Sequence, residues 1–219
     1  MRLARAVLNK AVLWGWLPKV PAVRMLPEPS SRVRWITRQE ADSLIQALPP
    51  WLADMAEFSL QTGLRRHNVT HLKWSEVDLP SRRLCVHADE AKAGKAIAVP
   101  LSEVALSLLR KRLFNGSSYV FAVKGKPVIA TSCRPWYRCL AEVGIDNFRW
   151  HDLRHTWASW HVQRGTPLHV LKELGGWADY EMVLKYAHLS CDHLSEWVNP
   201  EPLATLLATA PEKELVQSV

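Results

Sequence analysis

The chain has 219 residues, of which 48% are hydrophobic, and its formal net charge is +7 with a pI near 9.4. This length suffices for one substantial hydrophobic core with a small appendage. No stretch is long and apolar enough to span a membrane, no signal peptide is visible, and the four cysteines are too scattered for a zinc knuckle or a disulfide framework, so we expect reduced thiols in a cytosolic protein.

Residues 3–13 place apolar side chains on one helical stripe, which predicts a helix. Pro18, Pro21, Pro27 and Pro29 then predict an extended linker over residues 18–33. A lone helix cannot bury its own apolar face, so we interpret residues 1–17 as the last helix of a further domain. Eight basic residues against one acidic residue in the range 1–38 suit a polyanion partner, although ordinary solubility charge explains them as well.

The main domain is predicted to begin with a helix that runs to Leu48. Thr37 and Glu40 form a capping box at its N-terminus. A second helix, from about Trp51 to Gln61, should end at Gly63, because glycine readily adopts the left-handed conformation at a helix terminus. A short helix is expected near residues 66–72.

Residues 83–87 and 95–99 are predicted to form a β-hairpin, with residues 119–121 as the third strand of a small antiparallel sheet. Ser102 should cap a helix that extends to about Arg112. Further helices are expected near residues 131–142, 150–163, 167–174 and 179–187, with Gly165 after one helix, Thr166 as a cap and Pro167 as the first residue of the next. The predicted fold class is therefore α+β, mainly α.

His151, Arg154 and His155 fall on one side of a predicted helix, since they are three and four residues apart. A metal site would need a glutamate beside the first histidine and a third ligand, but here the neighbour is Asp152 and a fixed cation stands between the histidines. Binding of a phosphate by Arg154 and His151 is the alternative, because arginine offers a planar fork of donors and histidine exchanges a proton near neutral pH. Taken alone, this helix start is better explained by a plain ion pair of Asp152 with Arg154.

Three other candidates are ordinary when each is taken singly. Arg65 follows the glycine of Thr62-Gly63-Leu64-Arg65, Lys92 stands near the tip of the predicted hairpin, and Tyr186 lies in a predicted helix, where tyrosine is usually part of the core.

The combined order of these motifs is distinctive. Arg65 in TGLR, Lys92 before VPL, the HxxRH of residues 151–155, GGW ending at Trp177, and Tyr186 in YAHL follow one another along the chain. Together they resemble the tyrosine recombinases, also called the phage integrase family, over about residues 34–189. The resemblance implies that family's catalytic fold, with residues 34–189 as the catalytic domain and residues 1–17 as the end of a truncated core-binding domain.

The resemblance also implies a role for each matching residue. Tyr186 would attack a DNA phosphodiester and leave a 3′-phosphotyrosine, and Arg65 and Arg154 would bind the non-bridging oxygens. Lys92 would protonate the leaving 5′ oxygen, and His151 would assist proton transfer with Tyr186.

Three further positions complete the predicted site. Trp177 stands where many relatives carry a histidine, and its indole N–H would donate to the phosphate. His155 would support the site structurally. Asn68 occupies a position where many relatives carry an acidic residue, so it would support Arg65 by hydrogen bonding without supplying charge.

General chemistry supports these roles. Arginines aimed at the equatorial oxygens stabilise the charge that builds up there, and a positioned acid such as Lys92 should contribute about 10²–10⁴-fold. We expect no metal, because the arginines replace its charge. We expect no ATP, because the phosphotyrosine stores the energy of the broken bond, and no other cofactor.

The predicted partner is double-stranded DNA, with a homo-tetramer formed on paired sites through residues 190–219, whose Leu203, Leu206 and Leu207 form a small apolar stripe. We expect a protein of the bacterial cytoplasm, associated with the nucleoid, or one encoded by a phage or mobile element. Two alternatives stay open: a DNA-binding remnant without catalysis, and a metal-dependent phosphohydrolase built on His151, Asp152 and His155.

Overall fold

The computed structural model describes residues 2–22, 33–87 and 96–189, which belong to two units that divide between residues 32 and 33. The first unit contains α1 (Arg2–Leu13), which confirms the helix predicted over residues 3–13. Leu3, Val7 and Leu13 of this helix are exposed, and after it the rings of Trp14 and Trp16 lie 4.9 Å apart. No described helix has both the length and the apolar character needed to cross a membrane.

The second unit opens with α2 (Arg38–Ala47), and the predicted capping box is confirmed. Thr37 Oγ1 accepts from the Glu40 backbone N–H at 3.2 Å, while the Thr37 backbone N–H donates to Glu40 Oε2 at 2.7 Å. Two N–H groups that a helix start leaves without intrahelical partners are thereby satisfied.

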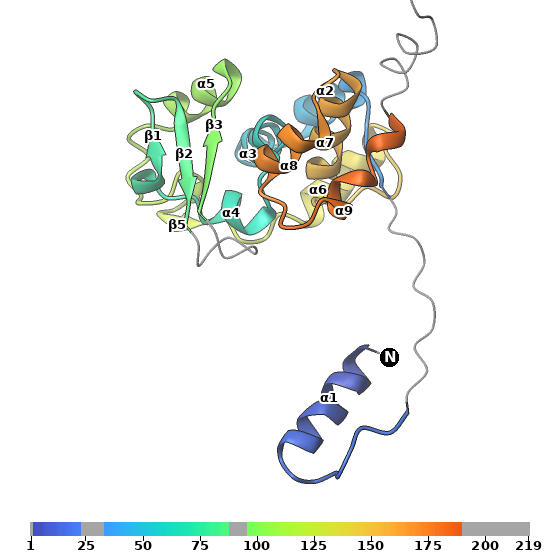
Figure 1. Ribbon diagram of the computed structural model, residues 1–219. Coiled ribbons are helices and arrows are strands. Elements are labelled where there is room, and N and C mark those ends of the chain that lie inside the picture. Colours follow the sequence, from blue (N-terminus) through green and yellow to red (C-terminus); the bar gives the residue numbers. More distant parts are fainter. Residues whose placement is uncertain (1, 23–32, 88–95, 190–219) are drawn as a thin grey trace, which may run out of the picture. The chain divides into compact units, whose positions relative to one another are not determined.

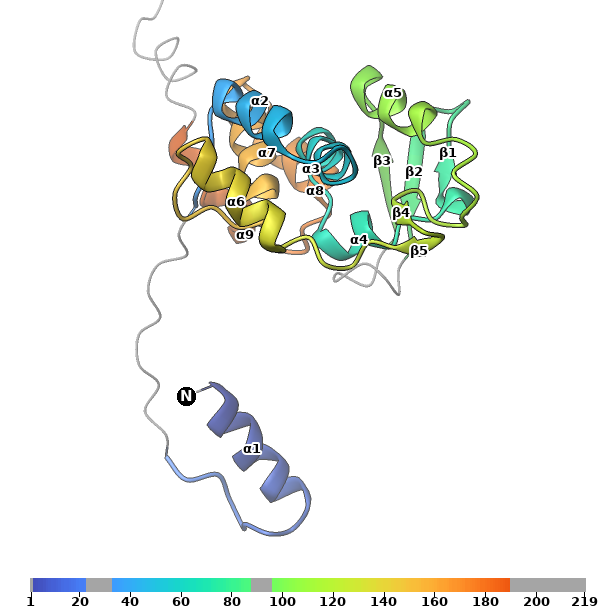
Figure 2. The ribbon, with the colours of Figure 1, turned by 180° about the vertical axis from the view of Figure 1, so that it is seen from behind.

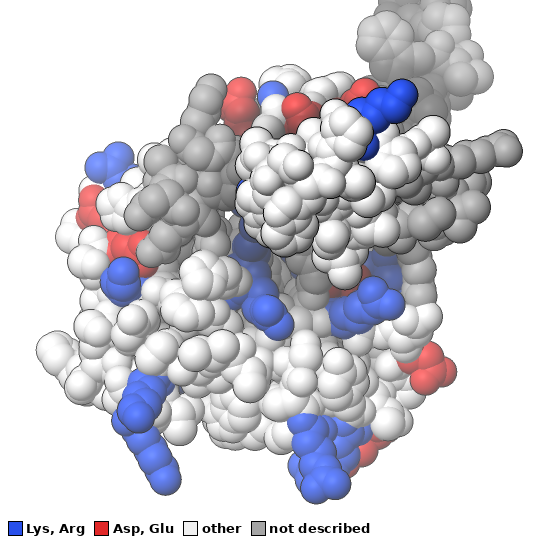
Figure 3. Space-filling view, turned by 90° about the horizontal axis from the view of Figure 1, so that it is seen from below, with Lys and Arg blue, Asp and Glu red and all other residues white. Residues whose placement is uncertain are grey.

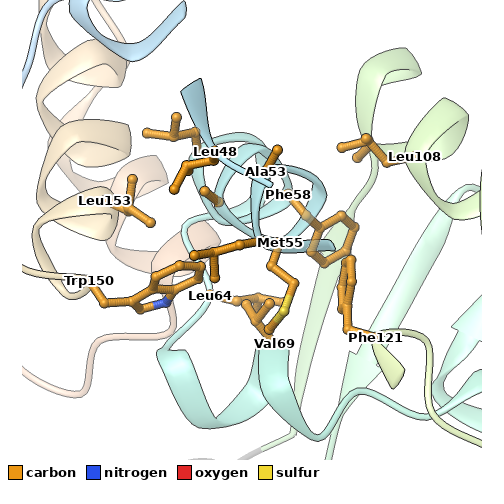
Figure 4. Packing of buried hydrophobic residues seen from close by; sticks show 14 of the residues in the cluster. Leu48, Ala53, Met55, Phe58, Leu64, Val69, Leu108, Phe121, Trp150 and Leu153 are labelled. Atoms are coloured by element: carbon orange, nitrogen blue, oxygen red, sulfur yellow. The ribbon is translucent and has the colours of Figure 1, made fainter. Parts of the chain in front are cut away.

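The centre of the unit is α3 (Pro50–Thr62) (Figures 1 and 2). On one side of it lie the sheet and α5 (Glu103–Lys111), and on the other lie α2, α6 (Arg134–Glu142) and α7 (Asp152–Gln163). Most of its side chains are buried, because it packs on both sides. Figure 4 shows Met55 and Phe58 of α3 inside this core, where the Phe58 and Phe121 rings lie 5.3 Å apart. As predicted, α3 ends at Gly63, whose φ is +62°.

A three-stranded antiparallel sheet follows α4 (Arg66–Thr70) and a 3₁₀ helix (η1, Trp74–Glu76). The sheet consists of β1 (Val77–Asp78), β2 (Arg83–Val86) and β3 (Ile97–Pro100). Leu84 of the middle strand pairs with Val77 on one side and with Val99 on the other.

The prediction that residues 119–121 supply the third strand was wrong. Tyr119 makes a single bridge to Lys73, and the Val120 N–H donates to Leu72 O, so this segment follows the end of α4 rather than the sheet. Residues beyond it form a separate hairpin, β4 (Ala122–Val123) with β5 (Lys126–Pro127).

Ser102 caps α5 (Glu103–Lys111), as predicted, by accepting from the Ala105 N–H. A buried ion pair fixes this helix to α3. Asp54 on α3 accepts from Lys111 at 3.0 Å and from Arg112 Nη2 at 2.7 Å. Because Asp54 is only 6% exposed, these two partners replace the water contacts that its carboxylate loses on burial.

The remaining helices confirm the predicted elements with tighter bounds: α6 (Arg134–Glu142), α7 (Asp152–Gln163), α8 (Leu168–Gly175), α9 (Glu181–Leu184) and a 3₁₀ helix (η2, Ala187–Leu189). The start of α8 differs from the prediction. Pro167 rather than Thr166 is the cap, because the Thr166 hydroxyl is paired with His161 Nδ1 at 3.1 Å. A small second hydrophobic cluster, which includes Trp157, Trp177 and Tyr186, joins the end of α7 to α8, α9 and η2.

Candidate active site

Arg154 is the most enclosed charged group of the site. It is 5% exposed, because it projects from the first turn of α7, a helix that is buried on almost every side. Its Nη1 donates to Gly63 O and its Nη2 to Gly175 O, both at 2.5 Å. The guanidinium carbon lies 4.3 Å from the centre of the Trp177 ring. Burial, and next the charge of Arg65, lower the pKa of Arg154 to about 9, so the group stays cationic at neutral pH.

Arg65 lies two residues after Gly63, where the left-handed turn redirects the chain from α3 toward α4. Its Nη2 is 3.4 Å from Gly176 O, a long contact. Burial lowers its pKa. The two arginines therefore bind carbonyls of the same Gly175-Gly176 segment, and they are close enough for the charge of Arg65 to lower the pKa of Arg154.

Tyr186 is fully buried between α9 and η2, and its hydroxyl is 2.6 Å from His155 Nδ1. Burial raises the pKa of Tyr186, and only in part does the charge of Arg154 offset this. Burial, followed by the charges of Lys185, His151 and Arg154, lowers the pKa of His155 to about 3. A neutral imidazole accepts a hydrogen bond from the phenol O–H at Nδ1, so its own proton is on Nε2.

His151 directly precedes α7 and is more exposed than His155. Its ring meets that of His155 edge to face at 5.1 Å between centroids. Partial burial and the charge of Arg154 lower its pKa. In this structure the tyrosine is thus paired with His155 and not with His151, for which the sequence had predicted the exchange of a proton with Tyr186.

Of the other predicted site residues, Trp177 and Asn68 are described by the structure and Lys92 is not. Trp177 is 6% exposed and lies against Arg154 and against Tyr186, with 6.0 Å between the Trp177 and Tyr186 rings. Asn68 is buried in α4, three residues after Arg65. Lys92 lies outside the described residues, so its role remains a prediction.

Sequence reasoning missed two features of the site. Lys185 is half-buried with its Nζ 5.2 Å from the centre of the Tyr186 ring, and burial lowers its pKa. Trp157, one turn beyond Arg154 on α7, packs against Gly63. The only sequence signal for Trp157 was its spacing of three residues from Arg154, and any amphipathic helix also produces such spacings.

Within the described part of the chain, no three His, Cys, Asp or Glu side chains are grouped so that they could hold a metal ion. His155, which the phosphohydrolase alternative would use as a ligand, points its Nδ1 at Tyr186 instead.

Comparison with known proteins identifies the fold and the family. Residues 34–193 match the sequence profile of the phage integrase family. The chain belongs to this family. It is 38% identical over 196 residues to the integrase of Salmonella phage P22, and this match covers 84% of this chain and 51% of that protein. It is 28% identical over 211 residues to the integrase of Haemophilus phage HP1, with 91% and 58% covered. The chain thus spans little more than half the length of these relatives.

Solved structures of phage integrase relatives confirm the predicted mainly helical α+β fold. The crystal structure of XerA recombinase superposes with a TM-score of 0.63 at 25% identity, over 80% of this chain and 67% of that one. The catalytic domain of the bacteriophage HP1 integrase superposes with a TM-score of 0.59 at 23% identity, over 79% of this chain and 98% of that domain.

Proposed function

We propose that this phage integrase family member is a site-specific DNA recombinase that cuts and rejoins DNA through Tyr186, without metal or ATP. The observation that supports it most is the single cluster in which the tyrosine hydroxyl, two histidines and two arginines meet. Three of these residues come from the HxxRH segment, and the other two are distant from it in the sequence.

The arginines supply the charge for phosphate binding. A guanidinium has five N–H donors. Two donors of Arg154 are taken by glycine carbonyls, so this group can be held in place and bind a non-bridging phosphate oxygen at the same time. Such fixed donors stabilise the negative charge that gathers on the equatorial oxygens during displacement.

In the proposed reaction, the Tyr186 oxygen attacks phosphorus, and the bond from phosphorus to the 5′ oxygen breaks. The phenol proton goes to a histidine, either His155, its partner in this structure, or His151. Lys92 protonates the leaving 5′ oxygen. The reverse sequence, with a 5′ hydroxyl of another strand as nucleophile, rejoins the DNA and regenerates tyrosine. Because the hydroxyl is buried here, DNA binding must bring it into contact with the phosphate.

Double-stranded DNA is the proposed partner. Solved relatives include a lambda integrase dimer bound to a COC′ core site and XerH bound to a palindromic difH substrate. The net charge of +7 suits a polyanion, and lysine and arginine side chains are visible at several places in Figure 3. We further propose a tetramer on paired sites through residues 190–219, which lie outside the described residues. The phage relatives favour a phage or mobile element as the source and the bacterial cytoplasm, at the nucleoid, as the place of action.

A suicide-substrate assay tests the proposal. The full chain is mixed with nicked DNA that carries candidate attachment sites, with chelator present, and is compared with Tyr186→Phe on a denaturing gel. A covalent protein–DNA band that the variant lacks supports the tyrosine mechanism. A band that persists in Tyr186→Phe contradicts it, and cleavage that chelator abolishes favours the phosphohydrolase. DNA retention on a filter without any covalent band favours the non-catalytic remnant, if the band also stays absent when a core-binding domain is fused to the chain.

A further inference from the structure

The two glycine carbonyls that bind Arg154 each belong to a residue with a tryptophan packed against its Cα. A Cβ on Gly63 would lie 2.2 Å from Trp157 Cε3, and a Cβ on Gly175 would lie 2.0 Å from Trp177 Cζ3. Both distances are far inside van der Waals contact, so each indole ring occupies the space that a side chain would need. The two tryptophan rings are themselves neighbours, 6.0 Å apart between centroids and inclined by 31°.

Trp157 therefore contacts the same residue that Arg154 uses as an anchor. Both side chains project from α7, one turn apart, and both reach Gly63 at the end of α3: the arginine binds its carbonyl and the indole covers its Cα. The indole is 4% exposed, and its Nε1–H has no hydrogen-bond partner among the described residues. A buried donor without a partner costs free energy. Any favourable contribution of Trp157 must therefore come from the packing of its ring and not from its N–H.

We propose that Trp157 is a positioning residue for Arg154. It presses on Gly63 and thereby fixes the carbonyl that orients the guanidinium toward the phosphate. The expected effect of Trp157 on cleavage rests on the proposed recombinase function. Its expected effect on the position of Arg154 does not, because it concerns the DNA-free protein. A guanidinium held by two short bonds moves when one carbonyl moves, and small misplacements of catalytic groups slow reactions by up to about 100-fold.

A chemically altered DNA substrate can distinguish a positioning role of Trp157 from a general loss of structure. In a methylphosphonate linkage, a methyl group replaces one charged non-bridging oxygen, so less charge is left for arginine to stabilise. A variant with a displaced Arg154 should lose more rate on the phosphodiester than on the methylphosphonate. A variant that is only less stable should lose rate on both alike.

The test compares Trp157→Leu and Trp157→Phe with Trp136→Leu in the full chain. Trp136 is the matched control, because it is also buried, also has an indole N–H without a partner among the described residues, and packs on Phe148 and Trp150 instead of the glycines. We expect Trp157→Leu to slow formation of the covalent complex about 10–100-fold, mainly on the phosphodiester. Trp157→Phe retains a ring on Gly63 and should stay within about threefold of the wild type, as should Trp136→Leu.

A second readout does not depend on cleavage. The side-chain Nε–H signal of Arg154, observed by ¹⁵N NMR in DNA-free protein, should shift and broaden in Trp157→Leu and remain unchanged in Trp136→Leu. An unchanged signal in a folded Trp157→Leu protein, or equal rate losses on both substrates, overturns the inference. If Trp157→Leu does not fold, Trp157→Met replaces it in both measurements. A wild-type protein that forms no covalent complex counts against the proposed function alone, since the Arg154 signal still decides the positioning role.

Discussion

Replacement of Gly63 by alanine should destabilise the protein for two separable reasons. The backbone at this position has φ +62°, a conformation that costs an alanine about 1–2 kcal/mol. The added methyl group would also meet the Trp157 ring at 2.2 Å, and overpacking of this kind typically costs about 1–3 kcal/mol. We expect Gly63→Ala to lower the free energy of unfolding by about 2–5 kcal/mol.

Gly144→Ala isolates the second contribution. Gly144 has a similar φ of +71° after the end of α6, but nothing lies within 4 Å of its ideal Cβ. Its replacement should cost only the backbone strain of about 1–2 kcal/mol. Urea denaturation of the two variants, followed by intrinsic tryptophan fluorescence, measures the difference between them.

The same pair of variants also links stability to chemistry. Gly63 O anchors Arg154, so Gly63→Ala should slow covalent complex formation at a temperature where both variants are folded, while Gly144→Ala should not. Equal unfolding free energies for the two variants would show that the Trp157 ring yields freely, and the packing argument would then fail. A large loss of stability with an unchanged cleavage rate would separate the Gly63 carbonyl from the orientation of Arg154.

Three further predictions follow from buried polar groups. The pKa of His155 is lowered to about 3 in the folded protein, so below about pH 6.5 the unfolded chain binds a proton that the folded protein does not. This histidine should therefore lower the free energy of unfolding by about 2 kcal/mol at pH 5. His155→Gln should flatten the fall in unfolding free energy between about pH 6.5 and 4. Asp54→Ala should cost about 3–5 kcal/mol in urea denaturation, because Arg112 is left largely buried without its partner, whereas the exposed Asp42→Ala should change little. Tyr186→Phe should cost only about 1 kcal/mol, the value of one hydrogen bond, so a loss of fold in that variant would contradict the modest structural role assigned to the hydroxyl.

Local signals predicted the helices well, because each depends on a few neighbouring residues. The capping box of Thr37 and Glu40, the cap at Ser102 and the stop at Gly63 all satisfy backbone groups within one turn. The third strand could not be predicted in this way. Val77–Asp78 is two residues long, too short to show an alternating pattern, and it is a strand only because β2 pairs with it across a turn.

Motif order predicted that Arg65, Arg154 and Tyr186 belong to one cluster, but it did not predict the pairings within it. His151 and His155 are four residues apart on one helix face, so the sequence offers both to Tyr186 equally. The choice depends on where α9 and η2 dock against α7, a tertiary contact between residues 31 positions apart. The glycine anchors of Arg154 were hidden for the same reason, since backbone carbonyls are present in every residue and only the fold aims two of them at one guanidinium.

The pairing of Tyr186 with His155 also bears on how the tyrosine becomes reactive. Burial raises the pKa of the phenol and lowers that of the imidazole, so both effects keep the proton on the tyrosine in this arrangement. A nucleophile needs the opposite, a phenol whose negative form is stabilised by nearby cations, and Arg154 is the cation whose charge already lowers the Tyr186 pKa. A phosphate bound between the arginines would bring negative charge beside the histidines and raise their pKa. The substrate would thus help to create the proton acceptor, and the tyrosine would remain unreactive until DNA is bound.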